Sequence, residues 1–107
     1  MVEDTIISVV KRYLKALESV GIHAHCAVLF GSFAKGRPDE YSDIDLIVIA
    51  PEFDGSREFD KVKNLWRTTV FTDNRIEPIP CGEKEWETDR SRPILEIARR
   101  DGMVISN

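Results

Sequence analysis

Residues 29–50 read LFGSFAKGRPDEYSDIDLIVIA, and this stretch decides the fold of the 107-residue chain. An apolar run ends at Gly31-Ser32, a polar segment follows, and a second apolar run opens with Asp43 and Asp45. Alternate side chains of a strand project to the same face, so the two carboxylates are expected to point the same way. The stretch therefore predicts two strands joined through a tight turn, with paired acids at the start of the second strand.

Two neighbouring carboxylates repel each other unless a cation lies between them or one of them is protonated. Oxygen ligands suit a hard cation such as Mg²⁺, whose coordination is commonly completed by water and substrate phosphates. In two-metal sites the ions lie roughly 3.5–4 Å apart and hold the attacking and leaving oxygens of an in-line displacement. An aspartate that opens a buried apolar run is also costly without such a purpose. Asp43 and Asp45 are therefore candidate metal ligands.

Gly31 and Ser32 are candidates for phosphate binding. Glycine allows positive φ and a close approach of the backbone to an anion, and successive amides in such a turn can surround a phosphate. The Ser32 hydroxyl can donate a further hydrogen bond. A Gly-Ser pair alone indicates only a turn, and Asp-x-Asp alone only a solvated strand end. Ten residues separate Ser32 from Asp43 here, between two apolar runs, and the combination favours a functional site.

This combination resembles the active-site signature of the nucleotidyltransferase superfamily that includes DNA polymerase beta, most closely its minimal nucleotidyltransferase (MNT) branch. The specific match lies within residues 29–50, and the ending at 94–105 is also similar to that of the family. The resemblance implies that Asp43 and Asp45 hold Mg²⁺, with two ions present when nucleotide is bound. It also implies that an NTP, ATP above all, donates a nucleoside monophosphate to an acceptor hydroxyl.

The superfamily pattern includes a third acidic residue on a neighbouring strand, and Glu77 in the segment NRIEPIPC (74–81) is the candidate. By resemblance it would help to hold the metal and accept the proton of the attacking group, although many relatives have Asp here. Pro78 and Pro80 lack amide donors, so the strand either ends there or leaves those positions unpaired. A surface glutamate on an edge strand is the alternative interpretation, and Asp73 is the fallback third acid.

The loop before the aspartates supplies two cations, Lys35 and Arg37, which could bind triphosphate oxygens, Arg37 with a bidentate fork. Exposed loop lysines and arginines are common, so simple solvation is an equal alternative. Three aromatic residues, Phe33, Tyr41 and Trp66, could stack on a nucleobase, although aromatic residues in such positions more often belong to the core.

Composition indicates one folded domain over residues 1–107, with 42% hydrophobic and 32% charged residues. A net charge of −4 argues against a general nucleic-acid surface and against a processive polymerase. A local contact with nucleic acid stays open. One basic cluster stands out as an RNA or acidic-protein contact or, alternatively, a solvated helix face: Arg90, Arg92, Arg99 and Arg100. No apolar run reaches membrane-spanning length and the start lacks signal-peptide features, so a cytoplasmic location is expected.

Apolar periodicity predicts helices and strands in an α/β (α+β) arrangement, a small mixed β-sheet flanked by helices, as in nucleotidyltransferase-type folds. The predicted helices are one from Asp4 or Thr5 to Gly21, one from Ser56 through Phe59, Val62, Leu65 and Trp66, a turn at 83–87 and one over 93–102. The predicted strands are 23–30, 43–50, 75–80 and 103–105. Residues 68–71 fit either the second helix or a strand.

Little chain remains outside this core, so we expect the acceptor to bring its own contacts or a partner to complete the pocket. MNT proteins are often paired with a HEPN partner, in many cases a ribonuclease toxin. The resemblance thus implies an antitoxin that attaches AMP to its partner. Two alternatives stay open: a non-catalytic module that neutralises a partner by contact, favoured by Glu77 in place of Asp, and a homodimer that shapes its own acceptor pocket.

Overall fold

Four strands form a mixed sheet in the order β3-β2-β1-β4 in the computed structural model, which describes residues 4–36, 42–55 and 59–107. Strand β1 is antiparallel to β2 and β4, and β2 is parallel to β3. The sheet therefore confirms the predicted fold class. The elements in chain order are α1 (Asp4–Glu18), β1 (Cys26–Phe30), β2 (Ile44–Ile49), the 3-10 helix η1 (Pro51–Phe53), α2 (Phe59–Phe71), β3 (Ile76–Cys81), α3 (Glu83–Thr88), α4 (Pro93–Asp101) and β4 (Met103–Ser106).

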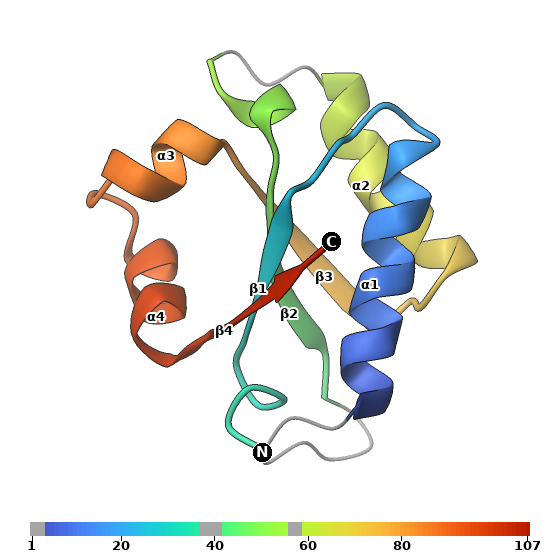
Figure 1. Cartoon of the computed structure of the whole chain (residues 1–107), viewed down its shortest axis with the longest axis horizontal. Helices are drawn as coiled ribbons and strands as arrows, with labels where there is room; N and C mark the ends of the chain where they lie inside the picture. Colours follow the sequence, from blue (N-terminus) through green and yellow to red (C-terminus); the bar gives the residue numbers. More distant parts are fainter. Residues whose placement is uncertain (1–3, 37–41, 56–58) are drawn as a thin grey trace.

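The helices cover both faces of the sheet. Figure 1 shows α1 and α2 together on one side and α3 and α4 on the other. Central strand β2 contributes to both layers: Leu46 belongs to the core cluster under α1 and α2, whereas Ile47 packs with Leu95 and Ala98 of α4. This alternation explains why the run after Asp45 is apolar at every position.

The two helices of the first layer are joined through a buried tyrosine. Tyr13 is fully buried on α1, and its hydroxyl donates a 2.7 Å hydrogen bond to the Leu65 carbonyl of α2. Burial raises the pKa of Tyr13, so this donor stays neutral. The apolar stripe predicted for the first helix lies on the same buried face of α1.

Strand β1 is shorter than the predicted 23–30, because its ladder to β2 begins at Cys26. The preceding segment is held by a side chain instead: the His23 backbone N–H donates to Glu52 Oε1 at 2.9 Å, and His23 Nδ1 lies 3.2 Å from Glu52 Oε2. The sequence pattern alone does not distinguish these two ways of satisfying an extended backbone.

Helix α2 continues through the ambiguous residues 68–71. Thr68 and Thr69 are buried, and their hydroxyls donate to the carbonyls of Asn64 and Trp66 within the helix, at 2.8 and 2.6 Å. The repeat that begins at Phe59 predicts the helix correctly. It gives the wrong buried face, because Leu65 is fully buried whereas Phe59 is 77% and Trp66 48% exposed.

Strand β3 includes both prolines and forms the edge of the sheet. The carbonyls of Arg75 and Cys81 accept hydrogen bonds from the N–H groups of Ile44, in β2, and Ala50, directly after it. Backbone groups two residues apart point to the same side, so the odd-numbered residues of β3 face β2, and Pro78 and Pro80 face the free edge. The missing amides therefore cost no ladder bond, which confirms the unpaired alternative.

No helix among the described residues is long and apolar enough to span a membrane.

Candidate active site

The predicted acidic residues lie at one end of the sheet, where β1 ends and β2 and β3 begin. Asp45 is opposite Phe30 of β1 on one side and opposite Glu77 of β3 on the other. The Gly31-Ser32 turn follows β1 directly, so the structure brings it to the same end. Figure 1 shows this turn next to the start of β2. Sequence positions nearly fifty residues apart thus form one cluster.

Gly31 packs directly against the carboxylate of Asp45. Its φ is +77°, a conformation that favours glycine. A Cβ at this position would lie 3.2 Å from Asp45 Cγ and closer still to Oδ2. Gly31 is therefore required both by the turn and by the carboxylate next to it.

The three carboxylates disfavour one another's charge. Burial, followed by the charge of Asp43, raises the pKa of the half-buried Asp45. The pKa of the exposed Glu77 is also raised, first by desolvation, then by the charge of Asp43, a hydrogen bond with it and the charge of Asp45. A hydrogen bond between two carboxyl groups requires a proton, so the cluster favours binding a proton or a cation.

The donor set fits a hard cation better than a soft one. Asp43, Asp45 and Glu77 offer only carboxylate oxygens, which Mg²⁺ prefers, and this ion usually retains waters and substrate phosphates instead of filling an all-protein cage. Within residues 4–36, 42–55 and 59–107, no three His, Cys, Asp or Glu side chains converge as a complete metal site. The described carboxylates thus offer a partial set of oxygen ligands, which further ligands would have to complete.

Arg75 lies next to the candidate site and was not among the residues predicted from the sequence. Its carbonyl accepts a 2.8 Å hydrogen bond from the Ile44 N–H, at the start of β2. Its guanidinium lies 5.8 Å from the Phe33 ring centroid, directly after the Gly-Ser turn. Arg75 therefore connects the turn to the strands that carry the acids. The Asp-x-Arg spacing ahead of Glu77 was the available signal.

Asp73, the fallback third acid, binds Arg75. Arg75 Nε and Nη2 donate to Asp73 Oδ1 and Oδ2 at 3.0 and 2.7 Å, and the Arg75 N–H donates to Oδ1 at 2.9 Å. The side-chain hydrogen bonds from Arg75 are the main reason that the pKa of Asp73 is lowered. The register places Glu77, instead of this fallback, opposite Asp45.

The other residues predicted to contact the nucleotide lie in or near the Gly-Ser turn, and the structure describes only some of them. Ser32 is half-buried in the turn, and Lys35 is exposed. The Lys35 charge contributes to lowering the pKa of Asp101, after the hydrogen bond and charge of Arg100. Phe33 is 7% exposed and belongs to the core, as its alternative interpretation predicted. Arg37 and Tyr41 lie outside the described residues.

The predicted basic cluster is ion-paired. Arg92 contacts Glu85 at 2.7 Å, Arg100 contacts Asp101 at 3.0 Å, and both Arg90 and Arg99 contact Glu96. This pairing argues against a free basic surface for nucleic acid. The four residues do not form one solvated helix face either, because Arg90 and Arg92 precede α4 and the Arg99 side chain is 13% exposed.

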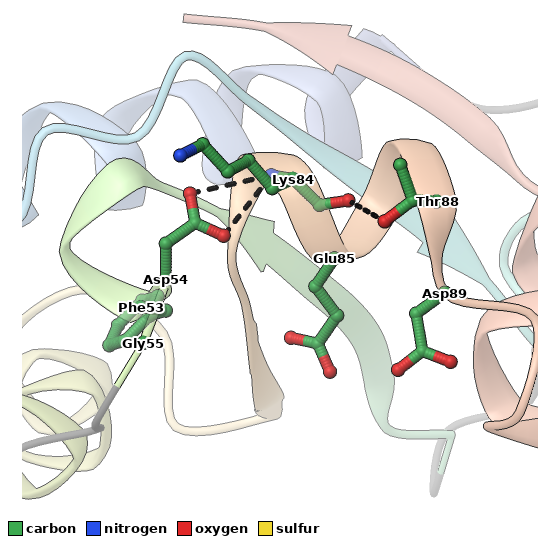
Figure 2. Close-up of a pocket in the computed structure, with 7 residues that line it drawn as sticks. All are labelled: Phe53, Asp54, Gly55, Lys84, Glu85, Thr88 and Asp89. Carbon is green, nitrogen blue, oxygen red and sulfur yellow. Dashed lines mark hydrogen bonds between the residues drawn. The ribbon is translucent and has the colours of Figure 1, made fainter.

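A cleft of about 880 Å³ lies at the other end of the sheet, between η1 and α3. Figure 2 shows Asp54 facing the start of α3, where both of its carboxylate oxygens accept from the Lys84 N–H, at 3.1 and 3.3 Å. Thr88 Oγ1 donates to the Lys84 carbonyl at 2.7 Å. These bonds satisfy a helix terminus, and the cleft has none of the acidic site residues.

The chain belongs to the nucleotidyltransferase domain family, whose model matches residues 8–100. Transfer of a nucleotidyl group is therefore its general kind of activity. Sequence comparison with curated proteins gives no match.

Two solved structures show the same fold. One is a Sulfolobus solfataricus protein whose own assignment as a nucleotidyltransferase is provisional; it is 18% identical, with a TM-score of 0.63 over 92% of this chain and 77% of that chain. The other is a toxin-antitoxin structure with AMP-PNP, also 18% identical, with a TM-score of 0.61 over 89% of this chain and 70% of that chain.

Proposed function

We propose that this chain is a Mg²⁺-dependent nucleotidyltransferase that moves a nucleoside monophosphate from an NTP, preferably ATP, to an acceptor hydroxyl. One observation carries the proposal: Asp45 is opposite Glu77 across β2 and β3, with the side-chain-free Gly31 beside its carboxylate. The family match supports the reaction class, and the AMP-PNP in the related toxin-antitoxin structure supports an adenine nucleotide as donor.

Each site residue has a defined task in this reaction. Asp43, Asp45 and Glu77 would hold Mg²⁺, which when bound supplies positive charge against the phosphate oxygens. The amides of the Gly31-Ser32 turn and the Ser32 hydroxyl would donate to the triphosphate. Because Gly31 has no side chain, the phosphate chain can approach Asp45 without obstruction.

The transfer requires one bond to form and one to break. The acceptor oxygen bonds to the α-phosphorus, the bond from that phosphorus to the bridging α–β oxygen breaks, and pyrophosphate leaves. The acceptor proton passes to a carboxylate, for which Glu77 is suited because its pKa is raised by desolvation and by the neighbouring acids. Positioning and charge compensation supply most of the rate in such reactions.

Calorimetric titration of ATP with and without Mg²⁺ tests the site before an acceptor is known. We expect Mg²⁺-dependent binding to the unmodified chain and its loss in the Asp43→Asn/Asp45→Asn double variant. Asp60→Asn, an exposed carboxylate on α2, is the matched control and should bind ATP normally. Equal binding by the double variant would contradict the proposed metal and phosphate roles.

The partner that we propose is a HEPN-type protein, neutralised by attachment of AMP. The likeness to a toxin-antitoxin structure supports a protein partner. A second candidate function is neutralisation by contact without catalysis, favoured by the lack of a converged three-ligand site among the described residues. A self-association that completes the acceptor pocket is a variant of the first function, and light scattering that gives a monomer mass would remove it.

The Asp43→Asn/Asp45→Asn variant also separates these two functions. If transfer neutralises the partner, the variant should no longer suppress the partner's activity, and mass spectrometry should find AMP only on a partner exposed to the unmodified chain. If contact is sufficient, the variant should suppress the partner as well as the unmodified chain does.

A further inference from the structure

The outer face of α2 has an unusual concentration of exposed apolar side chains. Phe59 is 77%, Trp66 48%, Val70 73% and Phe71 85% exposed. Single exposed apolar residues are normal on protein surfaces, but four large ones on one 13-residue helix form a patch. We refer to Phe59, Trp66 and Val70, with Phe71 at the end of the helix, as the α2 patch.

Helical spacing puts the first three members of the α2 patch on one side. Phe59, Trp66 and Val70 are seven and four residues apart, which brings them onto one stripe. The opposite side of the helix is buried through Leu65, Thr68 and Thr69. The α2 patch is therefore separate from the side of the helix that packs into the core.

The α2 patch surrounds a positive charge. Lys63 lies four residues after Phe59, and its Nζ is 5.9 Å from the Phe59 ring centroid. Arg67 follows Trp66 on the same exposed side. Neither cation has an acidic partner among the described residues, although the chain as a whole has a net charge of −4. Within the described part of the chain, the surface thus combines aromatic residues with a lysine and an arginine that have no acidic partner.

We propose that the α2 patch is the docking surface for a different protein, one that presents apolar side chains bordered by carboxylates. Exposed aromatic residues and arginine are enriched in protein interfaces and often dominate their binding energy. Carboxylates on the partner would meet Lys63 and Arg67 and give the contact its specificity. This inference does not depend on the active-site chemistry, because the surface lies on the helix layer opposite α4.

A second copy of this chain fits the surface less well. In a two-fold interface each residue meets its symmetry-related set. A parallel pairing of α2 helices puts Lys63 against Lys63 of the other copy. An antiparallel pairing centred near residue 63 does the same, and one centred near residue 65 puts Lys63 against Arg67. Each of these pairings brings like charges together, and a pairing centred between residues 63 and 64, which brings Asp60 against Arg67, leaves Lys63 without a carboxylate opposite it.

A membrane surface also fits less well than a protein. Helices that lie in a lipid interface combine a strongly basic polar face with an apolar face. The opposite side of α2 is buried in this chain, and Asp60 stands beside the two cations on the exposed side. A protein contact is consistent with a small patch of this mixed composition.

Site-specific photo-crosslinking followed by charge exchange tests the proposal. The full chain is expressed in its source cells with a benzophenone amino acid at position 70 and, as control, at the exposed position 87 of α3. We expect one protein to be crosslinked from position 70 and not from position 87. Capture alone is not support, so that protein is purified and titrated against this chain.

Charge exchange supplies the decisive result. Lys63→Glu/Arg67→Glu should weaken binding about tenfold or more, and added salt should weaken binding to the unmodified chain. Replacement of the facing partner carboxylates by lysine should restore binding to the double variant. Lys84→Glu, on α3, is the control and should have no effect, whereas Asp45→Asn should bind the partner normally even if all transfer is lost.

Four results would overturn the proposal: no specific crosslink, a partner that binds equally well after charge exchange, a dimer in sedimentation that Trp66→Glu converts to monomer, or binding of anionic vesicles that depends on Trp66. The last two outcomes would assign the patch to a second copy or to a lipid surface.

Discussion

Oδ2 of Asp45 occupies the space in which a side chain at residue 31 would begin. The last residue of β1, Phe30, is also the ladder partner of Asp45, so the turn that follows it cannot move away without disturbing the sheet. The absence of a side chain at Gly31 is therefore tied to the position of the carboxylate, and this relationship can be tested.

Gly31→Ala should reduce both stability and nucleotide binding. Positive φ disfavours alanine by about 1–2 kcal/mol, and the new methyl group would also overlap with the Asp45 carboxylate. We expect a lower denaturation midpoint together with loss of Mg²⁺-dependent ATP binding, measured by urea unfolding and calorimetry.

Gly55→Ala is the matched control for this change. Its φ is +78°, almost that of Gly31, but a Cβ there would meet nothing within 4 Å. The control should lose similar stability from the backbone and retain ATP binding. Equal loss of ATP binding in both variants would disprove a specific role for the Gly31–Asp45 contact.

Asp45→Asn should stabilise the chain at pH 7 when divalent cations are removed. The folded-state pKa of Asp45 is raised by burial and by Asp43, so the folded protein binds this proton more tightly than the unfolded chain does. The stabilisation that this bound proton gives to the folded state is therefore complete below the unfolded-state pKa of Asp45, about 3.9. It is lost as the pH rises through the folded-state pKa.

Thermal unfolding in a chelating buffer measures the effect. The Asn variant should melt a few degrees higher than the unmodified chain at pH 7, and the difference should disappear near pH 3.5. Mg²⁺ should stabilise the unmodified chain and leave the variant unchanged. A lower melting temperature for the variant at pH 7 would show that the Asp45 charge is stabilising.

Arg75→Ala should loosen the Gly-Ser turn. The change removes the paired hydrogen bonds to Asp73 and the contact with Phe33, at a cost of about 1 kcal/mol. Arg75→Lys keeps the charge but not the planar fork, so most of the loss should persist. Hydrogen exchange should be faster at residues 31–36 in both variants. Arg90→Ala, at an exposed ion pair with Glu96, should leave that exchange unchanged.

Arg99→Met should destabilise the second helical layer by about 2 kcal/mol. The Arg99 side chain is 13% exposed, its guanidinium lies 4.7 Å from the Trp86 ring centroid, and it donates to the Trp86 carbonyl. Arg100→Met is the neighbouring control, since that side chain is 72% exposed and should contribute less than about 0.5 kcal/mol. Similar urea midpoints for the two variants would contradict this account.

The Gly-Ser turn and the start of β2 could be predicted because the residues that define them lie close together in the sequence. The spacing from Gly31 to Asp45 fixes a turn and a strand start, and the ladder then brings Glu77 opposite Asp45. Strand alternation also places Ile44 on the face opposite Asp43 and Asp45, and in the structure this residue is fully buried in the core cluster under α1 and α2. The catalytic roles of these acids stay predictions.

Three features could not be read from the sequence because they depend on distant contacts. The segment before β1 is held by Glu52, which accepts a hydrogen bond from the His23 backbone N–H. The buried face of α2 is chosen by packing against α1 and the sheet, so apolar spacing from Phe59 did not reveal it. The place of Arg75 beside Phe33 requires two segments forty residues apart to meet.

The two prolines of β3 also determine how an acceptor can approach. Because Pro78 and Pro80 have no N–H to offer on the free side of the strand, another chain cannot extend the sheet there with a full set of backbone bonds. The edge beside Glu77 is thus closed to recognition by strand addition. If the proposed acceptor is a protein, it would have to bring its hydroxyl over the end of the sheet on a protruding side chain, which favours a loop or a terminus as the modified segment.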